Sequence, residues 1–358
     1  MTVAWIGDRG VPVADAAKHA AELLVTSSCP VFSFDTDVHG TRAAIALARA
    51  VGAAYDQLDG EAVARETAQH TDKGGMFIAP GEVRRRADVI VIVGALPAAH
   101  RDIMAGLAAT VPDLDAGTGR QFFLIGTEVK APAKVKATRL SCDGGLEATL
   151  AALRAQWAGR KTALEVTHFA HFAKALADAR FPVFTFCGQS VGTLGLEMLQ
   201  GLIADINGKQ RASALHLPAS ENGWGSTLAS TWTTGFPLRT SLMRGEAEFD
   251  PWRFDAARMI ADGEADLHLV VADDAKRLPA GSRNMALIAL TGTKKQVAGA
   301  AVTIAIGTPG LGHDAVFYAS RIGTLAAIEA KAPSELPSTA AVLRQIAEHL
   351  PQEEALPC

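Results

Sequence analysis

Short runs of β-branched and aromatic residues alternate with Ala- and Leu-rich stretches along most of the 358-residue chain. This alternation is typical of βαβ units built around a mostly parallel sheet. A strand that helices cover on both faces is apolar throughout its length, as the run Val89–Val93 is. The other strands predicted in this way are Val31–Phe34, Phe122–Ile125, Val183–Phe186, Leu267–Val271, Ala286–Leu290 and Val302–Ile306.

Helix signals lie between the predicted strands. Thr41 is the predicted N-cap of a helix that ends at Gly52. Further helices are predicted at Gly145–Trp157, from about Glu165 to Ala179, at Leu194–Ile206 and at Thr339–Leu350.

The chain length predicts two α/β domains, because 358 residues exceed what one ordinary core holds. The polar stretch Ala158–Thr162 is the predicted boundary, which gives domains at residues 1–160 and 161–358. Residues 1–12 contain the short apolar run Val3–Ile6, which is expected to add a strand to either half and is a candidate to pair with the second.

Charge and cysteine content exclude several classes of protein. A net charge of -4 gives no electrostatic basis for binding nucleic acid or an anionic membrane, and Arg84–Arg86 is interpreted as a solvated helix end. Apolar runs are of strand length, and the first residues lack a basic region followed by a long apolar stretch, so a cytoplasmic protein is expected. Cys29, Cys142, Cys187 and Cys358 form no Cys-x-x-Cys pair, which argues against a local zinc or iron–sulfur site.

Two Gly-rich turns, Cys187–Gly195 and Gly307–Gly312, each follow a predicted strand. The carboxyl ends of strands are where open α/β sheets place their ligand crevices. Neither turn has the spacing of a dinucleotide or phosphate-loop motif, so each is a plain tight turn or a phosphate-binding turn.

A few polar side chains are candidates for a site. Asp35, Asp37 and His39 follow a strand and serve either as loop and capping groups or as contacts to a ligand. His168 and His171 are expected on one helical face, as structural residues or as metal ligands with an acidic partner. No nucleophile is indicated, because Ser190 lacks a Gly-x-Ser-x-Gly elbow, and Cys187 is a buried thiol or an activated one.

The segment from Ser220 to Pro237 contains Trp224, Trp232 and many hydroxyl groups, without a clear helical or strand period. We expect a long ordered loop here. Such a loop is a Trp-anchored packing element, or it lines a cleft or a partner surface.

The end of this segment carries a resemblance to a known family. Ser230-Thr231-Trp232-Thr233-Thr234-Gly235-Phe236-Pro237, followed by Arg244-Gly245, resembles the Cys-Thr-Trp-Gln-Thr-Gly-Tyr-Pro region in the B subunit of formylmethanofuran dehydrogenase, which carries a tungsten or molybdenum pterin. Gly81–Ile90 resembles that family's Gly-Glu-Val-x-x-Arg-Ala-Asp-Val-Val, and Ser334–Ser338 its Ser-Asp-Leu-Pro-Ser. The resemblance implies two doubly wound α/β domains of the molybdopterin-oxidoreductase type.

The departures from the family pattern concern cysteine. Members of the family that act as dehydrogenases begin with a cysteine cluster for a [4Fe–4S] centre and carry a Cys or selenocysteine that binds the metal. In this chain no Cys precedes Cys29 or lies between Cys29 and Cys142, and the metal-ligand position falls near Ala62. The resemblance therefore implies that the iron–sulfur domain is missing and that the cluster and the tungsten or molybdenum pterin are lost, which leaves no cofactor, no metal and no catalytic residue in this chain.

Such a pattern is similar to the B subunit of the bacterial formyltransferase/hydrolase complex of methylotrophs. By resemblance, that complex moves a formyl group from a tetrahydromethanopterin carrier to a methanofuran-like carrier and hydrolyses it to formate. The implied partners are a formyltransferase subunit, a zinc-dependent hydrolase subunit and a small β-rich subunit, and the implied role of this chain is structural.

Two other functions stay open at the level of sequence. One is an active, pterin-dependent subunit of formylmethanofuran dehydrogenase that binds the pterin through Cys187–Gly195 and Gly307–Gly312. The other is a small-molecule binding protein that uses Trp224–Trp232. If a remnant of the pterin cleft survives, Asp37, His39, Thr233 and Arg239 are its predicted lining, without a catalytic role.

Overall fold

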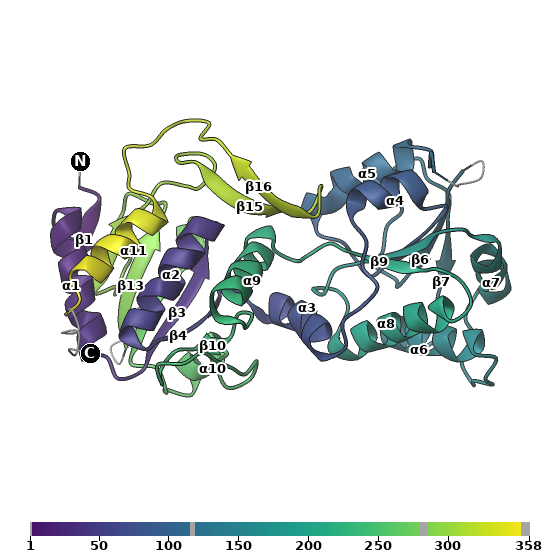
Figure 1. Cartoon of the computed structure of the whole chain (residues 1–358), viewed down its shortest axis with the longest axis horizontal. Coiled ribbons are helices and arrows are strands. Elements are labelled where there is room, and N and C mark those ends of the chain that lie inside the picture. Colours follow the sequence, from purple (N-terminus) through teal and green to yellow (C-terminus); the bar gives the residue numbers. More distant parts are fainter. Residues whose placement is uncertain (1, 115–118, 280–284, 352–358) are drawn as a thin grey trace, which may run out of the picture. The chain divides into compact units, whose positions relative to one another are not determined.

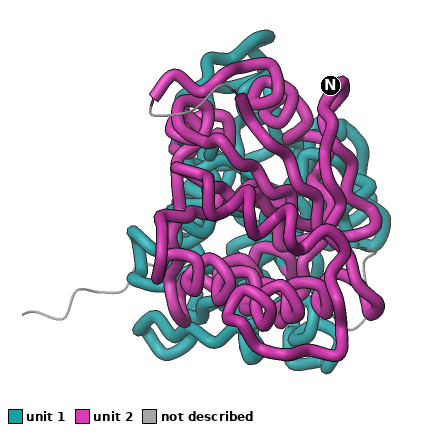
Figure 2. The backbone as a smooth tube through the Cα atoms, turned by 90° about the vertical axis from the view of Figure 1, so that its right-hand side faces the viewer, with its two compact units in different colours: residues 1–60, 221–318, 325–358 teal, residues 61–220, 319–324 magenta. Residues whose placement is uncertain are grey.

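In a computed structural model the chain forms two compact units, and the structure describes residues 2–114, 119–279 and 285–351. Unit 1 comprises residues 1–60, 221–318 and 325–358, and unit 2 comprises residues 61–220 and 319–324 (Figure 2). The structure therefore differs from the division predicted near residue 160. Strands from the two halves of the sequence pair with each other: Pro30, in the first half, lies opposite Leu267, in the second half, on neighbouring parallel strands.

The sheet of unit 1 has nine strands among the described residues, in the order β11-β10-β4-β3-β12-β13-β14-β1-β2. Its central strands β4, β3, β12, β13 and β14 are parallel, and the edges are antiparallel. β1 pairs with β14, so the N-terminal residues do add a strand to a sheet built largely from the second half of the chain. The strands are β1 (Ala4–Ile6), β2 (Arg9–Gly10), β3 (Pro30–Asp35), β4 (Ala54–Gln57), β10 (Thr240–Ser241), β11 (Glu248–Phe249), β12 (Leu267–Ala272), β13 (Ala286–Thr291) and β14 (Val302–Ala305).

Helices pack on the sheet of unit 1, which is why its central strands are buried (Figure 1). α10 (Ala256–Ala261) packs with Val31 and Ala54. The other helices of this unit are α1 (Val13–Thr26), α2 (Val38–Val51), α9 (Glu221–Thr234) and α11 (Thr339–Glu348), with a short 3₁₀ turn, η2, at Ala275–Arg277. A two-stranded ribbon of β15 (Ala315–Ala319) and β16 (Thr324–Ile328) is separate from the sheet.

The sheet of unit 2 is parallel, in the order β7-β6-β5-β8-β9. Alternate residues of β5 enter two separate hydrophobic clusters, Val91 in one and Ile90 in the other, so both faces of the sheet are covered. The strands are β5 (Val89–Val93), β6 (Gln121–Ile125), β7 (Ala137–Leu140), β8 (Pro182–Phe186) and β9 (Ser213–His216). The helices are α3 (Glu61–Asp72), α4 (Pro80–Arg86), η1 (Ala98–His100), α5 (Arg101–Ala109), α6 (Gly145–Trp157), α7 (Phe169–Asp178) and α8 (Thr193–Asn207).

The α/β class and the seven strands predicted from apolar runs are confirmed, with ends that shift by one residue or so. The predicted stop at Gly52 is also confirmed, because this residue ends α2 with a left-handed φ of 65°. Thr41 is not the N-cap of that helix. Asp37 is the cap, and the Thr41 hydroxyl lies inside α2, 2.8 Å from the Ser226 hydroxyl.

The prediction of a long loop from Ser220 to Pro237 is wrong, because most of this segment forms helix α9. Its buried face consists of small residues, among them Gly223, Ser226 and Ala229, so no stripe of large apolar side chains marks the helical period. Its threonines donate to the carbonyl four residues earlier, as Thr231 does to Thr227 at 2.9 Å. These bonds satisfy hydroxyl groups of a segment that the sequence left open as a packing element or as the lining of a cleft or partner surface.

His168 and His171 do not share a helical face. α7 begins at Phe169, and His168 precedes it with a left-handed φ of 58°. The His171 ring instead lies 5.4 Å from the ring of Phe123.

Among the described residues, none of the helices has the length and apolar character that crossing a membrane requires.

Candidate functional site

A cavity of about 310 Å³ lies in unit 1 beside the carboxyl end of its sheet. The loop after β3 contributes Asp37, the first turn of α2 contributes His39, and the turn after β14 contributes Gly307 and Pro309. The other lining residues come from the segment after that turn and from the start of α11: His313, Asp314, Ser338, Thr339, Ala340 and Arg344. The structure thus places one of the two Gly-rich turns next to the Asp37 loop.

Asp37 is committed to the backbone around this cavity. Its Oδ1 accepts from Gly40 N–H at 2.9 Å, which caps α2, and its Oδ2 accepts from Val316 N–H at 3.2 Å. The residue is 5% exposed. Its neighbour His39 is exposed, so the cavity has a fixed carboxyl group on one side and an accessible imidazole beside it.

The Gly307–Gly312 turn is tight and is held by backbone hydrogen bonds, one within the turn and one to Pro337. Gly312 N–H donates to Thr308 O at 2.7 Å, and Gly307 N–H donates to Pro337 O at 2.9 Å. A Cβ atom at Gly307 would lie 2.4 Å from Nε2 of His313, so a side chain at this position would displace the imidazole that lines the cavity.

Acidic side chains gather where the strand order of this sheet reverses, between β3 and β12. Asp35 ends β3, and Asp273 follows β12 directly. Arg277 binds Asp35, and its Nη2 lies 3.2 Å from Asp59 Oδ2. Burial, followed by the charges of Asp35 and Asp37, raises the pKa of Asp273 to about 6. The sequence reasoning missed Asp273 and Arg277, although an acidic pair directly after an apolar strand was the available signal.

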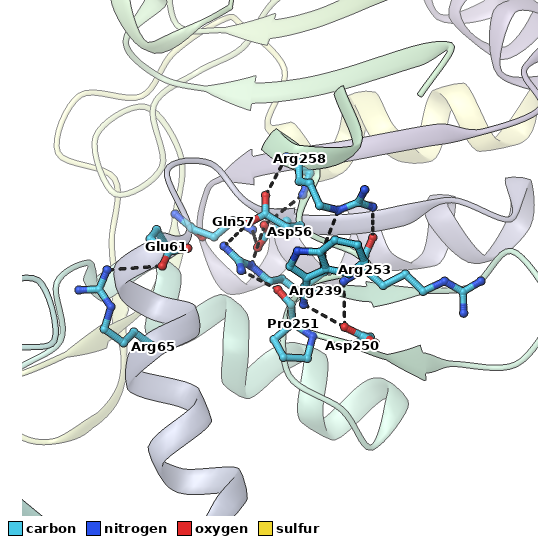
Figure 3. A network of polar contacts seen from close by, with 12 residues as sticks. Asp56, Gln57, Glu61, Arg65, Arg239, Asp250, Pro251, Arg253 and Arg258 are labelled. Carbon is cyan, nitrogen blue, oxygen red and sulfur yellow. Dashed lines mark hydrogen bonds and ion pairs between the residues drawn. The ribbon is translucent and has the colours of Figure 1, made fainter. Parts of the chain in front are cut away.

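Thr233 and Arg239 are not among the residues that line this cavity. The Thr233 hydroxyl donates to Ala229 O within α9 at 2.7 Å. Arg239 is 7% exposed and is held in an ion-pair network (Figure 3). Its Nε lies 3.2 Å from Asp56 Oδ2, its Nη2 lies 2.8 Å from Asp255 Oδ2, and its Nη1 donates to Pro251 O at 2.6 Å.

This network is structural in its geometry. The Asp56 side chain is 4% exposed, and burial raises its pKa to about 6 against the pull of the Arg239 charge. Arg239 itself has a left-handed φ of 64°, and its N–H donates to Tyr55 O. The guanidinium therefore fixes the start of β10 against β4 rather than facing a ligand with Asp37 and His39.

A second polar cluster lies in unit 2, at the carboxyl ends of β8 and β9. The carboxyl group of Glu66, from α3, accepts from the N–H groups of Gly188 and Ala219. His216 Nε2 lies 3.4 Å from Glu66 Oε1. Burial, then the neighbouring His216, lowers the pKa of His70 to about 4, and burial raises the pKa of the Cys187 thiol to about 12. Sequence reasoning missed Glu66, because a carboxyl group in the middle of a helix gives no signal of a strand-end partner.

Known proteins that are similar to this chain identify its family. Protein-family models give no match to the chain. The B subunit of the formyltransferase/hydrolase complex of Methylorubrum extorquens is 35% identical over 356 residues, which span 97% of this chain and 98% of that protein. The chain belongs to the family of formyltransferase/hydrolase complex B subunits. The resemblance predicted from its motifs is thereby confirmed.

The structure agrees with this assignment. A chain in the crystal structure of the formyltransferase/hydrolase complex from Methylorubrum extorquens, in complex with methylofuran, superposes with a TM-score of 0.85 and 34% identity. The match covers 96% of this chain and 98% of that one. A more distant relative is the B subunit of the tungsten-containing formylmethanofuran dehydrogenase 2 from Methanocaldococcus jannaschii, 24% identical over 281 residues, which are 72% of this chain and 63% of the relative.

The described residues of this chain do not fit a tungsten or molybdenum centre held by a thiolate. Ala62, at the predicted ligand position, lies in α3 and has no donor atom in its side chain. The Cys187 thiol is buried and lies 3.7 Å from Glu66 Oε1, and Cys29 packs against the hydrophobic cluster that contains Val31 and Ala54. Cys142 donates to Asp143 O, and Cys358 lies outside the described residues. Within the described part of the chain, no group of three or more His, Cys, Asp or Glu is arranged to hold a metal ion.

Proposed function

We propose that this chain is the B subunit of a formyltransferase/hydrolase complex that acts in the cytoplasm. By its resemblance, the complex passes a formyl group from a tetrahydromethanopterin carrier to a methanofuran-like carrier and releases formate. The observation that carries the proposal is the end-to-end match, 97% of this chain and 98% of the B subunit from Methylorubrum extorquens. A shared fold alone would not favour one function in this way.

Within the complex the chain is a structural subunit without catalytic residues, a pterin or a metal. Its proposed partners are the formyltransferase subunit, the zinc-dependent hydrolase subunit and a small β-rich subunit. Its two α/β units are, in this proposal, doubly wound domains of the molybdopterin-oxidoreductase type without the iron–sulfur domain. The strand orders, which reverse inside both sheets, support that part of the proposal.

The charged side chains that are the best candidates for catalysis support a structural role, because each of them forms hydrogen bonds or ion pairs with other residues of the chain. Asp37 caps α2 and also accepts from Val316 N–H. Arg239 is paired with Asp56 and Asp255. Glu66 accepts from strand-end amides. Each of these three side chains already makes a contact that orders the backbone.

The test is to purify the complex through a tag on this chain and to measure its metals and its activity together. We expect zinc and formate release, without tungsten, molybdenum or pterin. The variants Asp37→Asn and His39→Ala, which change the cavity of unit 1, should leave the rate of formate release within about twofold of wild type, since they remove no transition-state contact.

Stoichiometric tungsten or molybdenum with formylmethanofuran oxidation would overturn the proposal in favour of a dehydrogenase subunit. A chain that purifies alone, with no formyltransferase or hydrolase activity attached to it, would also overturn it. A loss of formate release of about 100-fold in Asp37→Asn, in a complex that assembles normally, would contradict the non-catalytic role alone.

A further inference from the structure

Two backbone amides at the carboxyl end of the sheet in unit 2 converge on one buried carboxyl group. Gly188 N–H donates to Glu66 Oε1 at 2.7 Å, and Ala219 N–H donates to the same oxygen at 3.1 Å. Gly188 follows β8 and Ala219 follows β9, and these strands are neighbours in the sheet. The Glu66 side chain is 0% exposed. Its carboxyl group is therefore held by the ends of two strands rather than by solvent.

Further polar groups surround the same oxygen. The Cys187 thiol lies 3.7 Å from Glu66 Oε1, and His216 Nε2 lies 3.4 Å from it. A Cβ atom at Gly188 would lie 2.3 Å from Cγ of Glu66, so the glutamate stem fills the space above the strand end. Backbone N–H groups that converge at the carboxyl end of a parallel sheet are the usual means by which α/β proteins bind phosphate and carboxylate groups.

A second carboxyl group lies at the other end of the same turn. Gly192 is the N-cap of α8, which has no acidic residue in its own first turn. A Cβ atom at Gly192 would lie 2.5 Å from Oε1 of Glu147, a residue of α6. Negative groups are favourable at a helix N-terminus, so Glu147 occupies a place where an anionic ligand would otherwise be attracted.

We propose that Gly188 and Ala219 form an oxyanion cradle and that Glu66 is its built-in ligand, which together with Glu147 closes the Cys187–Gly195 turn to phosphate-bearing molecules. A phosphate at this turn would have to displace the Glu66 carboxyl group and approach Glu147. The negative charges of the phosphate and of Glu147 would then repel each other. The sequence left open whether this turn binds phosphate or is plain. The cradle is of the anion-binding kind, and its occupant comes from the chain itself. This inference does not depend on membership in the complex.

The experiment removes the Glu66 carboxyl group by mutation and supplies a carboxylate from solution in its place. Glu66→Ala in the full chain deletes the equivalent of one acetate molecule, namely Cγ and the carboxyl group. Thermal unfolding is followed in sodium acetate, in acetamide and in sodium chloride at matched ionic strength. We expect Glu66→Ala to lower Tm by roughly 5 °C or more, and acetate to raise the Tm of this variant by about 3 °C over chloride. Acetamide, which has the same shape without the charge, should have a smaller effect.

The wild type and the control variant Glu197→Ala should shift by less than about 1 °C with acetate. Glu197 is a suitable control because it is a carboxylate of the same unit, 44% exposed, paired with Lys73 on the surface. A Glu66→Ala variant whose Tm responds equally to acetate, acetamide and chloride would overturn the proposal. Such a result would mean that the two amides do not select an anion.

A second variant covers the case in which Glu66→Ala does not fold. Glu66→Gln keeps the shape of the side chain and one carbonyl oxygen that can accept from both amides, but it removes the negative charge. We expect its Tm to fall by several degrees, without rescue by acetate, because the amide fills the cradle. A Glu66→Gln variant as stable as the wild type would show that the cradle does not require a negative group, and it would equally overturn the inference.

Discussion

Arg239 and Asp56 form a buried ion pair in unit 1, with Nε 3.2 Å from Oδ2 and side-chain exposures of 9% and 4%. The pair connects β4, which contains Asp56, to the segment that begins β10. It is the central contact of the network in Figure 3. A guanidinium held in this way determines stability rather than ligand binding.

Arg239→Ala should therefore destabilise the chain by about 3–5 kcal/mol, because it leaves the Asp56 carboxyl group buried without its partner. Chemical denaturation of the variant and the wild type measures the difference. Arg244→Ala is the matched control, since the side chain of Arg244 is 68% exposed and its ion pair with Glu248 should contribute no more than about 1 kcal/mol. Equal stabilities for Arg239→Ala and the control would show that the buried pair is not structural.

Asp273 gives a prediction about pH. Burial and the charges of Asp35 and Asp37 raise its pKa from 3.8 to about 6 in the folded chain. Between these two values the folded state holds a proton that the unfolded state has lost, so the contribution of Asp273 to the free energy of unfolding decreases as pH rises from about 4 to about 6. Above that range its contribution is constant and unfavourable.

Asp273→Asn removes this charge, so the variant should be more stable than the wild type at pH 7 by about 1–2 kcal/mol, a value reduced for the partial exposure of the site. The difference should shrink toward zero at pH 4. Urea unfolding at a series of pH values measures it. A stability difference that is the same at pH 4 and pH 7 would mean that packing, not charge, separates the two proteins.

The predicted strands were correct because each is an apolar run covered on both faces, and burial leaves that signature in a few consecutive residues. The division into units could not be predicted in the same way. Unit 1 is assembled from three segments, and its sheet places β3 beside β12, so that Pro30 faces Leu267. Nothing local to residue 160 records a pairing between strands that lie so far apart in the sequence.

The same distinction applies to the candidate site. Asp37 and His39 follow a strand, which is a local signal, and both line the cavity of unit 1. Arg239 carried no local sign of its partner, since Asp56 is 183 positions away. α9 was missed for another reason: its buried face has Gly, Ser and Ala where an amphipathic helix usually shows Leu or Ile.

His268 predicts sensitivity to acid. It lies in β12, is 3% exposed, and burial lowers its pKa from 6.5 to about 4. A group whose folded pKa is lowered binds its proton first in the unfolded state, so its contribution to stability is complete above about pH 6.5 and is lost as pH falls toward 4. His268→Leu should abolish this loss, and at pH 5 the variant should gain about 2 kcal/mol relative to the wild type, beyond any difference at pH 7.

Chemical unfolding of His268→Leu and of the wild type at pH 5 and at pH 7 gives the difference in their free energies of unfolding at each pH. The exposed residue His39, changed to Leu in the same way, is the control for a histidine without burial. If His268→Leu has the pH dependence of the wild type, the imidazole of His268 does not titrate during unfolding in this range.

Asp37 allows the capping role to be separated from a role in ligand contact. Asp37→Ala removes the acceptors for Gly40 N–H and Val316 N–H and should cost about 1–2 kcal/mol of stability, as the loss of an N-cap usually does. Asp37→Asn keeps one oxygen to cap α2 and should cost less, because Asn is as good an N-cap as Asp. Thermal unfolding of both variants, with formate release of the assembled complex measured beside it, distinguishes the two roles. If capping is the whole role, activity follows stability, and Asp37→Asn stays close to the wild type in both; an Asn variant that is stable but inactive would place the Asp37 charge in contact with a ligand.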